Sequence, residues 1–401
     1  MKLLHTADWH LGRSLEGRSR AEEQEQVMDE ICCIADEEHV DAILMAGDVF
    51  DTVNPPAASE ALFYETAQRL SLGGKRPVLI IAGNHDSPER LEASRPLAGR
   101  QGITIVGRPV LKPLVIPIKR TDETLVLGCV PYPSESRLNE CLSEINDEDM
   151  IKAAYNERLA ALFREQAKSF NKDAVNILMT HLFAAGGKES DSERPIQVGG
   201  AYTVHPSAFP RSAQYVALGH LHRPQNLLDS PVPARYAGSP LAYSFSEAGR
   251  PKSISILEGM PGAPLALREI ELKSGRPLTR WHAENGLNEV HQWIDEARDP
   301  EAWIDLEIRL DEAMSMHDIQ ALRKARPRIV TIRPIYNSVE EDKERSERSN
   351  LPIDELFVRF YKKQTDGAEP GTDLIRLFMQ LIDEDEAARE VAAGRVPNET
   401  D

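Results

Sequence analysis

The chain has 401 residues, of which 41% are hydrophobic and 28% are charged, close to an ordinary globular protein, and no stretch approaches the roughly 20 apolar residues of a membrane span. Its formal net charge of −18 is unfavourable for a protein that binds nucleic acid directly, because phosphate contacts normally come from Lys and Arg. Composition alone therefore argues either for a partner that supplies basic surface or against nucleic acid as a ligand.

The start of the chain and its cysteines indicate a cytoplasmic protein. Met1 leads directly into a strand-like segment, which is not the pattern of a signal peptide. The cysteines lack the paired spacing of a metal site, and we expect them to be reduced thiols: Cys32, Cys33, Cys129 and Cys141.

The first part of the chain alternates short apolar runs with amphipathic stretches, the pattern of a mostly parallel sheet covered on both faces. Helices are predicted at 21–38 and 58–72, each with an apolar stripe along one face. Such sheets bind ligands at the carboxyl ends of their strands. The predicted strands are Lys2–Thr6, Ala42–Ala46, Val78–Ala82, Leu125–Val130, Val175–Met179 and Tyr215–Leu218.

A second module is predicted from residue 265 to 339, after a first domain at 1–264. The alternation of apolar and polar residues at 303–310 suits a strand with one buried face. Further strands are expected at 280–284 and 328–335, and helices at 287–297 and 316–324. This is the pattern of a small α+β domain.

The C-terminal part is predicted to be a charged linker at 340–350 and a helical segment with an acidic tail at 351–401. Two apolar stripes follow helical spacing, and they could pack on the second module or meet a partner protein. The charged linker and the marginal stability of short helices favour the partner. The stripes are Ile353, Leu356, Phe357 and Phe360, then Leu374, Leu377, Phe378, Leu381 and Ile382.

Five polar clusters stand at the ends of predicted strands and contain five of the eleven histidines. Carboxylate, imidazole and amide groups together form a ligand set for two divalent transition ions. Alternate residues of an extended segment point to the same side, as in D-x-H and H-x-H. The clusters are Asp8-Trp9-His10, Gly47-Asp48-Val49-Phe50-Asp51, Gly83-Asn84-His85-Asp86, Thr180-His181 and Gly219-His220-Leu221-His222.

Each cluster taken singly is a weak signal, because a polar residue at a strand end more often makes an ordinary hydrogen bond. Five in series make coincidence a poor explanation. Asp51 could touch a metal ion or support a ligand from behind. Arg13, Arg18 and Arg20 could contact phosphate or be ordinary solvated charges.

In this order and at these strand ends, the motifs resemble the calcineurin-like metallophosphoesterase family over roughly residues 1–240. The resemblance implies an α/β fold, a sheet sandwich flanked by helices. It implies one metal ion at Asp8, His10, Asp48 and His222, and a second at Asp48, Asn84, His181 and His220. It also implies that His85 protonates the leaving oxygen while Asp86 orients the His85 ring.

The surrounding sequence resembles the DNA-cutting branch of the family more narrowly, with HTADWHLG at 5–12, GDVFD at 47–51, AGNHDS at 82–87 and ALGHLH at 217–222. That branch implies a Mn²⁺-dependent nuclease in DNA repair and recombination, acting as a 3′–5′ exonuclease on duplexes and an endonuclease on single strands and hairpins. The module at 265–337 would then cap the DNA path.

The same resemblance implies a homodimer within a heterotetramer. The partner would be a coiled-coil ATPase that docks on residues 351–390, and the dimer face would lie at 58–72. These partner assignments rest on the resemblance and on the apolar stripes of the tail.

Two rival functions remain open at this point. Other branches hydrolyse phosphoproteins, cyclic nucleotides or nucleotide-sugar diphosphates with the same site, and the acidic balance suits such substrates. A DNA-end tether without catalysis would be marked by loss of a ligand, yet every ligand position of the pattern is filled. The residues do not discriminate among Mn, Fe and Zn.

Overall fold

The computed structural model describes residues 1–143, 154–194, 202–336, 352–364 and 369–392. The chain divides into two compact units. The first holds Met1–Arg309 and Met314–Pro334, and the second holds Leu310–Ala313 and Ile335–Asp401. Among the described residues, no helix is both long and apolar enough to cross a membrane.

The first sheet has six strands in the order β12-β11-β1-β2-β3-β4. Four of them run parallel in chain order: β1 (Lys2–Thr6), β2 (Ala42–Ala46), β3 (Val78–Ile81) and β4 (Ile103–Val106). On the other side of β1, two antiparallel strands extend the sheet: β11 (Lys252–Glu258) and β12 (Ala266–Leu272).

The second sheet also has six strands, in the order β5-β6-β7-β8-β10-β9. Its parallel centre consists of β6 (Glu123–Val130), β7 (Val175–His181), β8 (Tyr215–Gly219) and β10 (Ala234–Tyr236). Antiparallel strands close both edges: β5 (Leu114–Ile118) and β9 (Gln225–Asn226).

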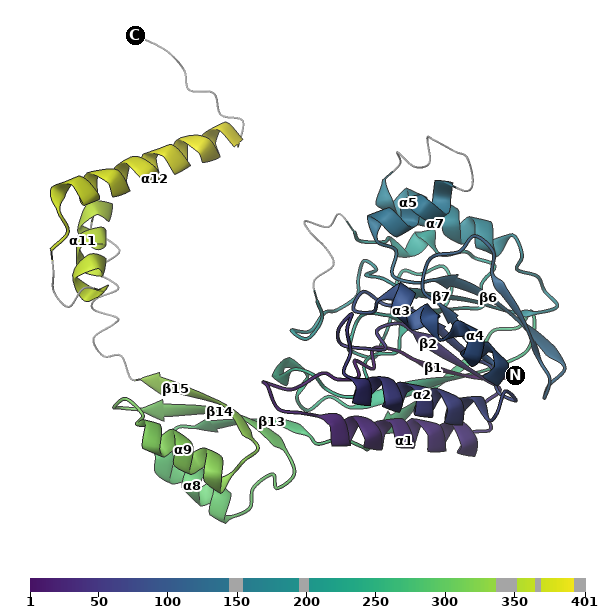
Figure 1. Cartoon of the computed structure of the whole chain (residues 1–401), viewed down its shortest axis with the longest axis horizontal. Helices are drawn as coiled ribbons and strands as arrows, with labels where there is room; N and C mark the ends of the chain where they lie inside the picture. Colours follow the sequence, from purple (N-terminus) through teal and green to yellow (C-terminus); the bar gives the residue numbers. More distant parts are fainter. Residues whose placement is uncertain (144–153, 195–201, 337–351, 365–368, 393–401) are drawn as a thin grey trace, which may run out of the picture. The chain divides into compact units, whose positions relative to one another are not determined.

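Helices cover the outer faces of both sheets (Figure 1). Helices α1 (Ala21–Glu37) and α2 (Ala57–Ser71) pack on the first sheet, and α5 (Glu135–Ser143) and α7 (Tyr155–Ala167) pack on the second. Between the sheets lies an apolar layer that includes Leu44 and Leu79 from one sheet and Leu127 and Ile177 from the other. The expected sandwich is confirmed.

Short helices follow β3 and join the later strands. Three lie between β3 and β4: α3 (Pro88–Ala93), α4 (Arg95–Ala98) and the 3₁₀ turn η1 (Gly99–Gln101). Two further 3₁₀ turns are η2 (Pro206–Ala208) and η3 (Phe245–Glu247). The turn η3 begins with a capping box, in which Ser244 and Glu247 satisfy each other's main-chain N–H groups.

The sequence predicted β1 and β2 to the residue and α1 and α2 to within one residue. The boundary at 264/265 needs correction, because β12 pairs along the whole of β11 and therefore belongs to the first sheet. The alternation of buried and exposed residues in β12 is weak, since Ala266–Glu269 are all exposed at the sheet edge. The second module therefore begins closer to Leu278.

That module is a three-stranded sheet of β13 (Leu278–Ala283), β14 (Trp303–Leu310) and β15 (Ile329–Tyr336). Helices α8 (Gly286–Asp295) and α9 (Met316–Ala325) lie on one side of it (Figure 1). The predicted alternation in β14 is confirmed by complete burial of its inward residues: Ile304, Leu306 and Ile308.

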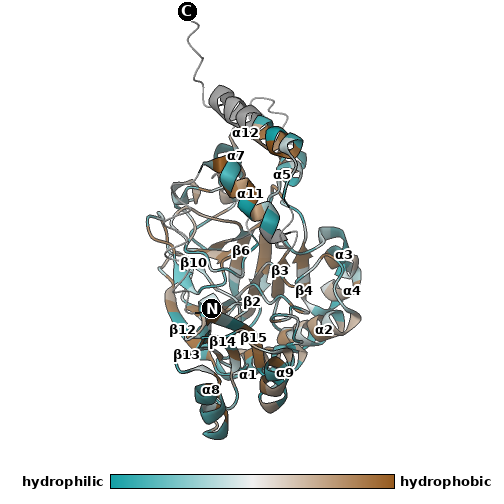
Figure 2. Ribbon diagram, turned by 90° about the vertical axis from the view of Figure 1, so that its left-hand side faces the viewer, coloured by the Kyte–Doolittle hydropathy of each residue, from teal (hydrophilic) through white to brown (hydrophobic). Residues whose placement is uncertain are grey.

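The second unit contains α11 (Ile353–Gln364) and α12 (Thr372–Ala392), which match the two predicted amphipathic helices. Figure 2 shows hydrophilic and hydrophobic residues along both helices. The rings of Phe357 and Phe378 stack with their centroids 4.1 Å apart, so the two helices pack on each other. The linker predicted at 340–350 and the end of the acidic tail, 393–401, lie outside the described residues.

Candidate metal centre

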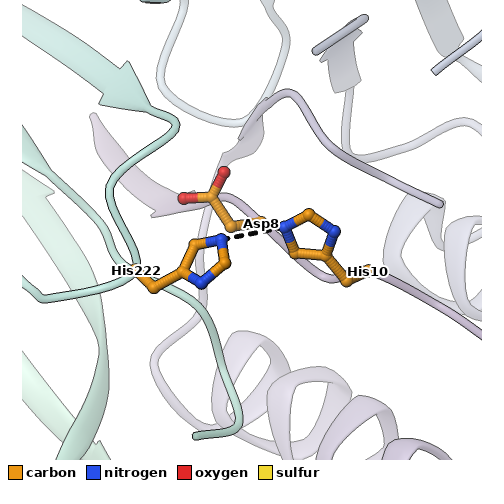
Figure 3. Close-up of side chains that lie close together, drawn as sticks. All are labelled: Asp8, His10 and His222. Atoms are coloured by element: carbon orange, nitrogen blue, oxygen red, sulfur yellow. Dashed lines mark hydrogen bonds between the residues drawn. The ribbon is translucent and has the colours of Figure 1, made fainter. Parts of the chain in front are cut away.

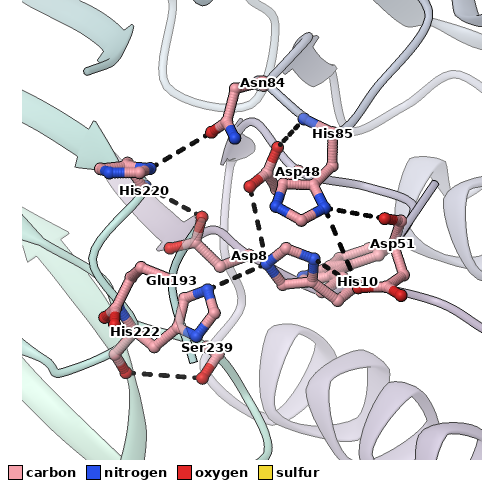
Figure 4. A network of polar contacts seen from close by, with 12 residues as sticks. Asp8, His10, Asp48, Asp51, Asn84, His85, Glu193, His220, His222 and Ser239 are labelled. Atoms are coloured by element: carbon pink, nitrogen blue, oxygen red, sulfur yellow. Dashed lines mark hydrogen bonds and ion pairs between the residues drawn. The ribbon is translucent and has the colours of Figure 1, made fainter. Parts of the chain in front are cut away.

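All five polar clusters converge at one end of the sandwich, where the carboxyl ends of parallel strands from both sheets meet. The first sheet supplies clusters that follow β1, β2 and β3, and the second supplies clusters at the ends of β7 and β8. Packing of the two sheets brings residues more than 130 positions apart in the sequence into contact. Nδ1 of His181, for example, lies 2.9 Å from the main-chain oxygen of Ala46. Figure 4 shows most of these side chains around one centre.

Four of the predicted ligands have a backbone in the left-handed region, which is rare for residues other than glycine. The φ angles are 54° at Asp8, 45° at His10, 52° at Asp48 and 108° at His220. Such strain is retained where the surrounding structure demands it, and it concentrates at functional sites. Each strand therefore turns sharply at its end and directs its ligand side chain to the centre.

Two motif glycines are required by close packing at the same place. A Cβ atom on Gly219 would lie 1.9 Å from the main-chain oxygen of Ala46, and one on Gly83 would lie 2.0 Å from Oδ1 of Asp48. Neither neighbour can move without displacing a strand end or a ligand. The glycines thus explain part of the motif pattern without any direct role in chemistry.

The first group of donor atoms comes from Asp8, His10 and His222 (Figure 3). Their side chains are buried, and Nε2 of His10 lies 2.9 Å from Nε2 of His222. Oδ2 of Asp8 is buried and has no hydrogen-bond partner, whereas Oδ1 accepts from the main-chain N–H of His220 at 2.9 Å. Together these atoms form a donor group that would hold a cation.

The second group comes from Asp48, His181 and His220, with Asn84 beside it. Oδ1 of Asn84 lies 2.9 Å from Nε2 of His181 and 3.2 Å from Nδ1 of His220. Oδ2 of Asp48 lies 3.5 Å from Nε2 of both His10 and His181. Asp48 consequently stands between the two groups, where a bridging carboxylate would be needed.

The protonation of the histidines suits metal binding. Burial lowers the pKa of His220 to about 3 and the pKa of His222 well below its ordinary value, and it also lowers that of His10. These rings are therefore neutral at physiological pH, and a neutral imidazole is the form that binds a metal ion.

His181 and Asp48 carry opposite charges in the absence of a cation. Burial opposes charge on His181, yet the carboxylate of Asp48 raises the His181 pKa to about 9. Burial likewise opposes charge on Asp48, and the nearby His181 holds the Asp48 pKa well below its usual value. A divalent cation would replace this proton as the positive partner of Asp48.

The donor set fits two divalent cations. Nδ1 of His181 donates to the main-chain oxygen of Ala46 at 2.9 Å, so the proton that pairs with Asp48 is on Nε2, and Nε2 would offer its lone pair to a cation once that proton is lost. Without the Nε2 proton, several acceptor atoms would point at one another, an arrangement that is favourable only around positive charge. Nε2 of His220 is also buried and without a hydrogen-bond partner.

His85 lies beside the two donor groups and belongs to neither of them. Its Nδ1 lies 2.7 Å from the main-chain oxygen of Asp51, and its main-chain N–H donates to Oδ1 of Asp48 at 2.9 Å. The ring borders a cavity of about 350 Å³ that is also lined by Arg13, Asp51 and Arg194. His85 is therefore placed between the candidate cation sites and a space for substrate.

The expected role of Asp86 is corrected by its contacts. Its carboxylate accepts three main-chain N–H groups, from Gly83 at 2.8 Å, Phe50 at 3.0 Å and Val49 at 3.1 Å. Burial, with the charge of Asp48, raises the Asp86 pKa to about 6 against these donors. Asp86 fastens the Asp48 loop to the Asn84 loop, and the contact that orients the His85 ring comes from Asp51.

Asp51, which the sequence left open, supports two histidines. Its Oδ1 lies 3.4 Å from Nδ1 of His10 and 3.9 Å from Nδ1 of His85. Arg13 approaches the same oxygen at 3.6 Å and donates to the main-chain oxygen of Ser192 at 2.6 Å. Asp51 thus links the first candidate cation site to the His85 ring.

The three early arginines differ in their surroundings. Arg20 is buried and donates to the carboxylate of Glu23, so its charge is already paired inside the protein. Arg18 is exposed. Arg13 reaches the cavity beside His85, and it remains the candidate for a phosphate contact among the three.

Residues that sequence reasoning missed lie in the loop after β7 and in η3. Ser192 contacts Nδ1 of His222, Glu193 accepts from the main-chain N–H of His222, and Glu247 accepts from Ser192. These residues sit outside the five clusters and far from His222 in the sequence. No sequence motif marks these residues, because only the fold brings them to the site.

The family pattern of the calcineurin-like phosphoesterases matches residues 1–224, and the pattern described as the type 5 capsule protein repressor C-terminal domain matches residues 274–365. The first range contains all seven predicted ligands. The second begins near β13 and ends just after α11.

Curated proteins named as SbcD, one of the subunits of the nuclease SbcCD, are similar along nearly the whole chain. The one from Bacillus subtilis (strain 168) is 50% identical over 390 residues, covering 96% of this chain and 100% of that protein. Those from Escherichia coli K12 and O157:H7 are each 30% identical over 373 residues, covering 90% of this chain and 92% of those proteins.

Among solved structures, TT1561 of Thermus thermophilus aligns with a TM-score of 0.34 at 13% identity, covering 63% of this chain and 92% of that one. A likeness this weak carries no part of the assignment. The family pattern, by contrast, spans more than half of the chain, and the Bacillus relative matches from end to end. The chain therefore belongs to the SbcD nucleases of the calcineurin-like phosphoesterase family.

Proposed function

We propose that this chain is a Mn²⁺-dependent DNA nuclease, with 3′–5′ exonuclease activity on duplexes and endonuclease activity on single strands and hairpins. Its place would be in DNA end processing, repair and recombination, in the cytoplasm. The observation that carries the proposal is the convergence of seven metal-type ligands from two sheets, six of them buried, in a chain 50% identical to a nuclease subunit.

In this proposal Asp8, His10, Asp48 and His222 hold one cation, and Asp48, Asn84, His181 and His220 hold the other. Bound there, two divalent cations would polarise the scissile phosphate and lower the pKa of an attacking water. The protein holds the donor atoms in place, and burial of six of these side chains makes their positions rigid. The six are Asp8, His10, Asp48, His181, His220 and His222.

His85 is the proposed acid for the leaving sugar oxygen. Nδ1 donates to the main-chain oxygen of Asp51, so Nε2 is the ring atom left to deliver a proton. In the protonated ring, Nδ1–H stays on Asp51 while Nε2–H faces the substrate. With one ring nitrogen held by Asp51 and the other directed at the substrate, the ring need not move during the reaction.

The partner would be an SbcC-type coiled-coil ATPase bound to residues 351–390. Support comes from apolar side chains that are exposed on α11 and α12, among them Phe360 at 61% and Leu381 at 56%. The net charge of −18 also favours a partner that brings basic surface to DNA. A homodimer through 58–72, within a heterotetramer, remains a further proposal.

The test is digestion of a linear duplex labelled at defined 3′ ends, with Mn²⁺, by the unaltered chain and by His85→Ala. We expect metal-dependent cutting and a rate about 100- to 1,000-fold lower in the variant, as for loss of a positioned acid. The matched control is His317→Ala, because that side chain is 91% exposed and far from any motif.

Several results would contradict the proposal. Equal cutting by His85→Ala and His317→Ala would remove His85 from the role of acid. Hydrolysis of a small chromogenic phosphodiester, with no cutting of DNA even when the coiled-coil ATPase is added, would favour a small-molecule phosphodiesterase. Loss of cation binding in His85→Ala would show that His85 is a ligand instead.

A further inference from the structure

We propose that Ser192 and Glu247 are positioning residues that fix the tautomer and orientation of His222 for cation binding. The inference rests on the proposed function, since it concerns the same metal centre. It deepens that function by assigning a task to a loop and a 3₁₀ turn outside the motif clusters.

The path from His222 runs through two buried side chains. Nδ1 of His222 lies 2.6 Å from Oγ of Ser192, and Ser192 donates its hydroxyl hydrogen to Oε1 of Glu247 at 2.7 Å. Ser192 is 4% exposed and Glu247 is 2% exposed, so water does not compete for these bonds. Because the Ser192 hydrogen is used on Glu247, its oxygen must accept from His222.

This direction decides which nitrogen of His222 carries the hydrogen. With the hydrogen on Nδ1, the lone pair is on Nε2, the atom that lies 2.9 Å from Nε2 of His10 in the first donor group. The opposite tautomer would place a hydrogen where the cation belongs and would leave Ser192 without a donor. Histidine ligands are commonly held in this way by a second residue behind the ring.

Glu247 is itself fixed as an acceptor. Its Oε1 also accepts the main-chain N–H groups of Tyr243 and Ser244, each at 3.1 Å, and its Oε2 pairs with the ammonium group of Lys252. Lys252 is 8% exposed and donates in turn to the main-chain oxygen of His222 at 2.8 Å. The contacts close a ring that holds His222 by its side chain and by its main chain.

One neighbouring contact in the loop competes for Ser192 without changing this conclusion. Oγ of Ser190 lies 2.8 Å from Oγ of Ser192, but Ser190 donates its own hydrogen to Glu193 at 2.7 Å. The loop is anchored separately where Ser246 accepts from the main-chain N–H of Asp191 at 3.1 Å. That anchor offers a control that removes a hydroxyl from the same region without touching His222.

The experiment compares the full chain with its Ser192→Ala and Ser246→Ala variants by Mn²⁺ titration calorimetry after removal of bound metal. We expect Ser192→Ala to weaken one of two cation sites by about 10- to 100-fold and to leave the other unchanged. Ser246→Ala should bind both cations as the unaltered chain does.

A second measurement uses ¹⁵N shifts of selectively labelled histidines in the metal-free chain. We expect a single Nδ1–H tautomer at His222 in the unaltered chain and a mixture in Ser192→Ala. Unchanged affinity and an unchanged tautomer in Ser192→Ala would overturn the inference, as would equal weakening by both variants, which would mean that the hydroxyls act by anchoring the loop. Failure of the unaltered chain to bind two cations would instead count against the proposed function, and the tautomer measurement would still decide this inference.

Discussion

The candidate metal centre and the C-terminal helix pair place opposite kinds of side chain in opposite environments. In the centre, charged and polar side chains such as Asp8 and Asp48 are buried to within 1%. On α11 and α12, apolar side chains such as Phe360 and Leu377 are 61% and 52% exposed. Each arrangement costs free energy by itself, because buried charge loses its hydration and exposed apolar surface orders or excludes water.

The difference indicates what kind of ligand or partner suits each region. Buried donor atoms that face one another need a small, strongly charged ligand, since only an ion fits among them. Exposed apolar stripes on helices suit a large apolar surface, and the proposed one is that of another protein. The same chain therefore combines donor groups suited to cations with a helix surface for which a protein partner is proposed, and the two can be tested separately.

The largest effect is expected at Asp48, the carboxylate between the two donor groups. Asp48→Asn removes the negative charge that both proposed cations would share, and it should lower the rate of DNA cutting by at least about 1,000-fold. That loss exceeds the about 10- to 100-fold that is usual for a residue behind a ligand. Calorimetry with Mn²⁺ should show loss of both sites, and Asp173→Asn, at an exposed position, is the control.

The same substitution should leave the helix pair untouched. Binding of the coiled-coil ATPase to Asp48→Asn at the affinity of the unaltered chain would support the separation of the two regions. A parallel loss of partner binding would show that they are coupled.

The next effect concerns the helix pair. Leu377→Asp with Leu381→Asp places charges on neighbouring positions of one helix face, where the side chains are 52% and 56% exposed. Each leucine that becomes buried at an interface contributes about 1.5–3 kcal/mol, so the pair should weaken partner binding by at least about 100-fold. Mn²⁺-dependent cutting by the isolated chain should not change.

Arg376→Ala serves as the matched control, because it lies on the same helix and its side chain is 78% exposed. Binding should be measured with the purified partner by calorimetry or fluorescence anisotropy. If the double variant binds as tightly as Arg376→Ala, residues 351–390 are not the docking segment.

The smallest effect is expected for a substitution of Glu23, a carboxylate whose hydrogen bonds are all made within the protein. Glu23, on α1, accepts from Arg20, from the main-chain N–H of Arg276 and from the indole of Trp303 at 2.8 Å, and so ties β14 to the nuclease domain. Glu23→Gln keeps the shape but loses the charge, and it should reduce the free energy of unfolding by about 1–2 kcal/mol. Thermal and urea unfolding measure this change.

The pH dependence of that difference has a definite sign. Burial works against the Glu23 charge, but the hydrogen bonds from Arg20 hold the Glu23 pKa below its ordinary value in the folded protein. A lowered folded pKa gives stability that is present above the unfolded pKa and is lost as the pH falls. The gap between the unaltered chain and Glu23→Gln should therefore shrink below about pH 4. A gap that widens on acidification would contradict the ion-pair account.

Local patterns in the sequence determined much of this protein. Short apolar runs predicted β1 and β2, and helical spacing predicted α1, α2, α11 and α12, because secondary structure depends largely on neighbouring residues. The five polar clusters could be recognised because each directly follows a strand. Their order along the chain was enough to indicate a two-metal phosphoesterase.

Contacts between distant segments were decided by the tertiary structure alone. The edge pairing of β12 with β11 placed that strand in the first sheet, although its exposed residues gave no clear alternation. Asp86 adjoins His85 in sequence, yet its carboxylate turns to the N–H groups of Val49 and Phe50 because those donors are buried and need an acceptor. Ser192 and Glu247 reach His222 only when the loop after β7 and the turn η3 pack against β8. Hydrogen-bond satisfaction in a buried site depends on which groups the fold brings together, and no spacing in the sequence records it.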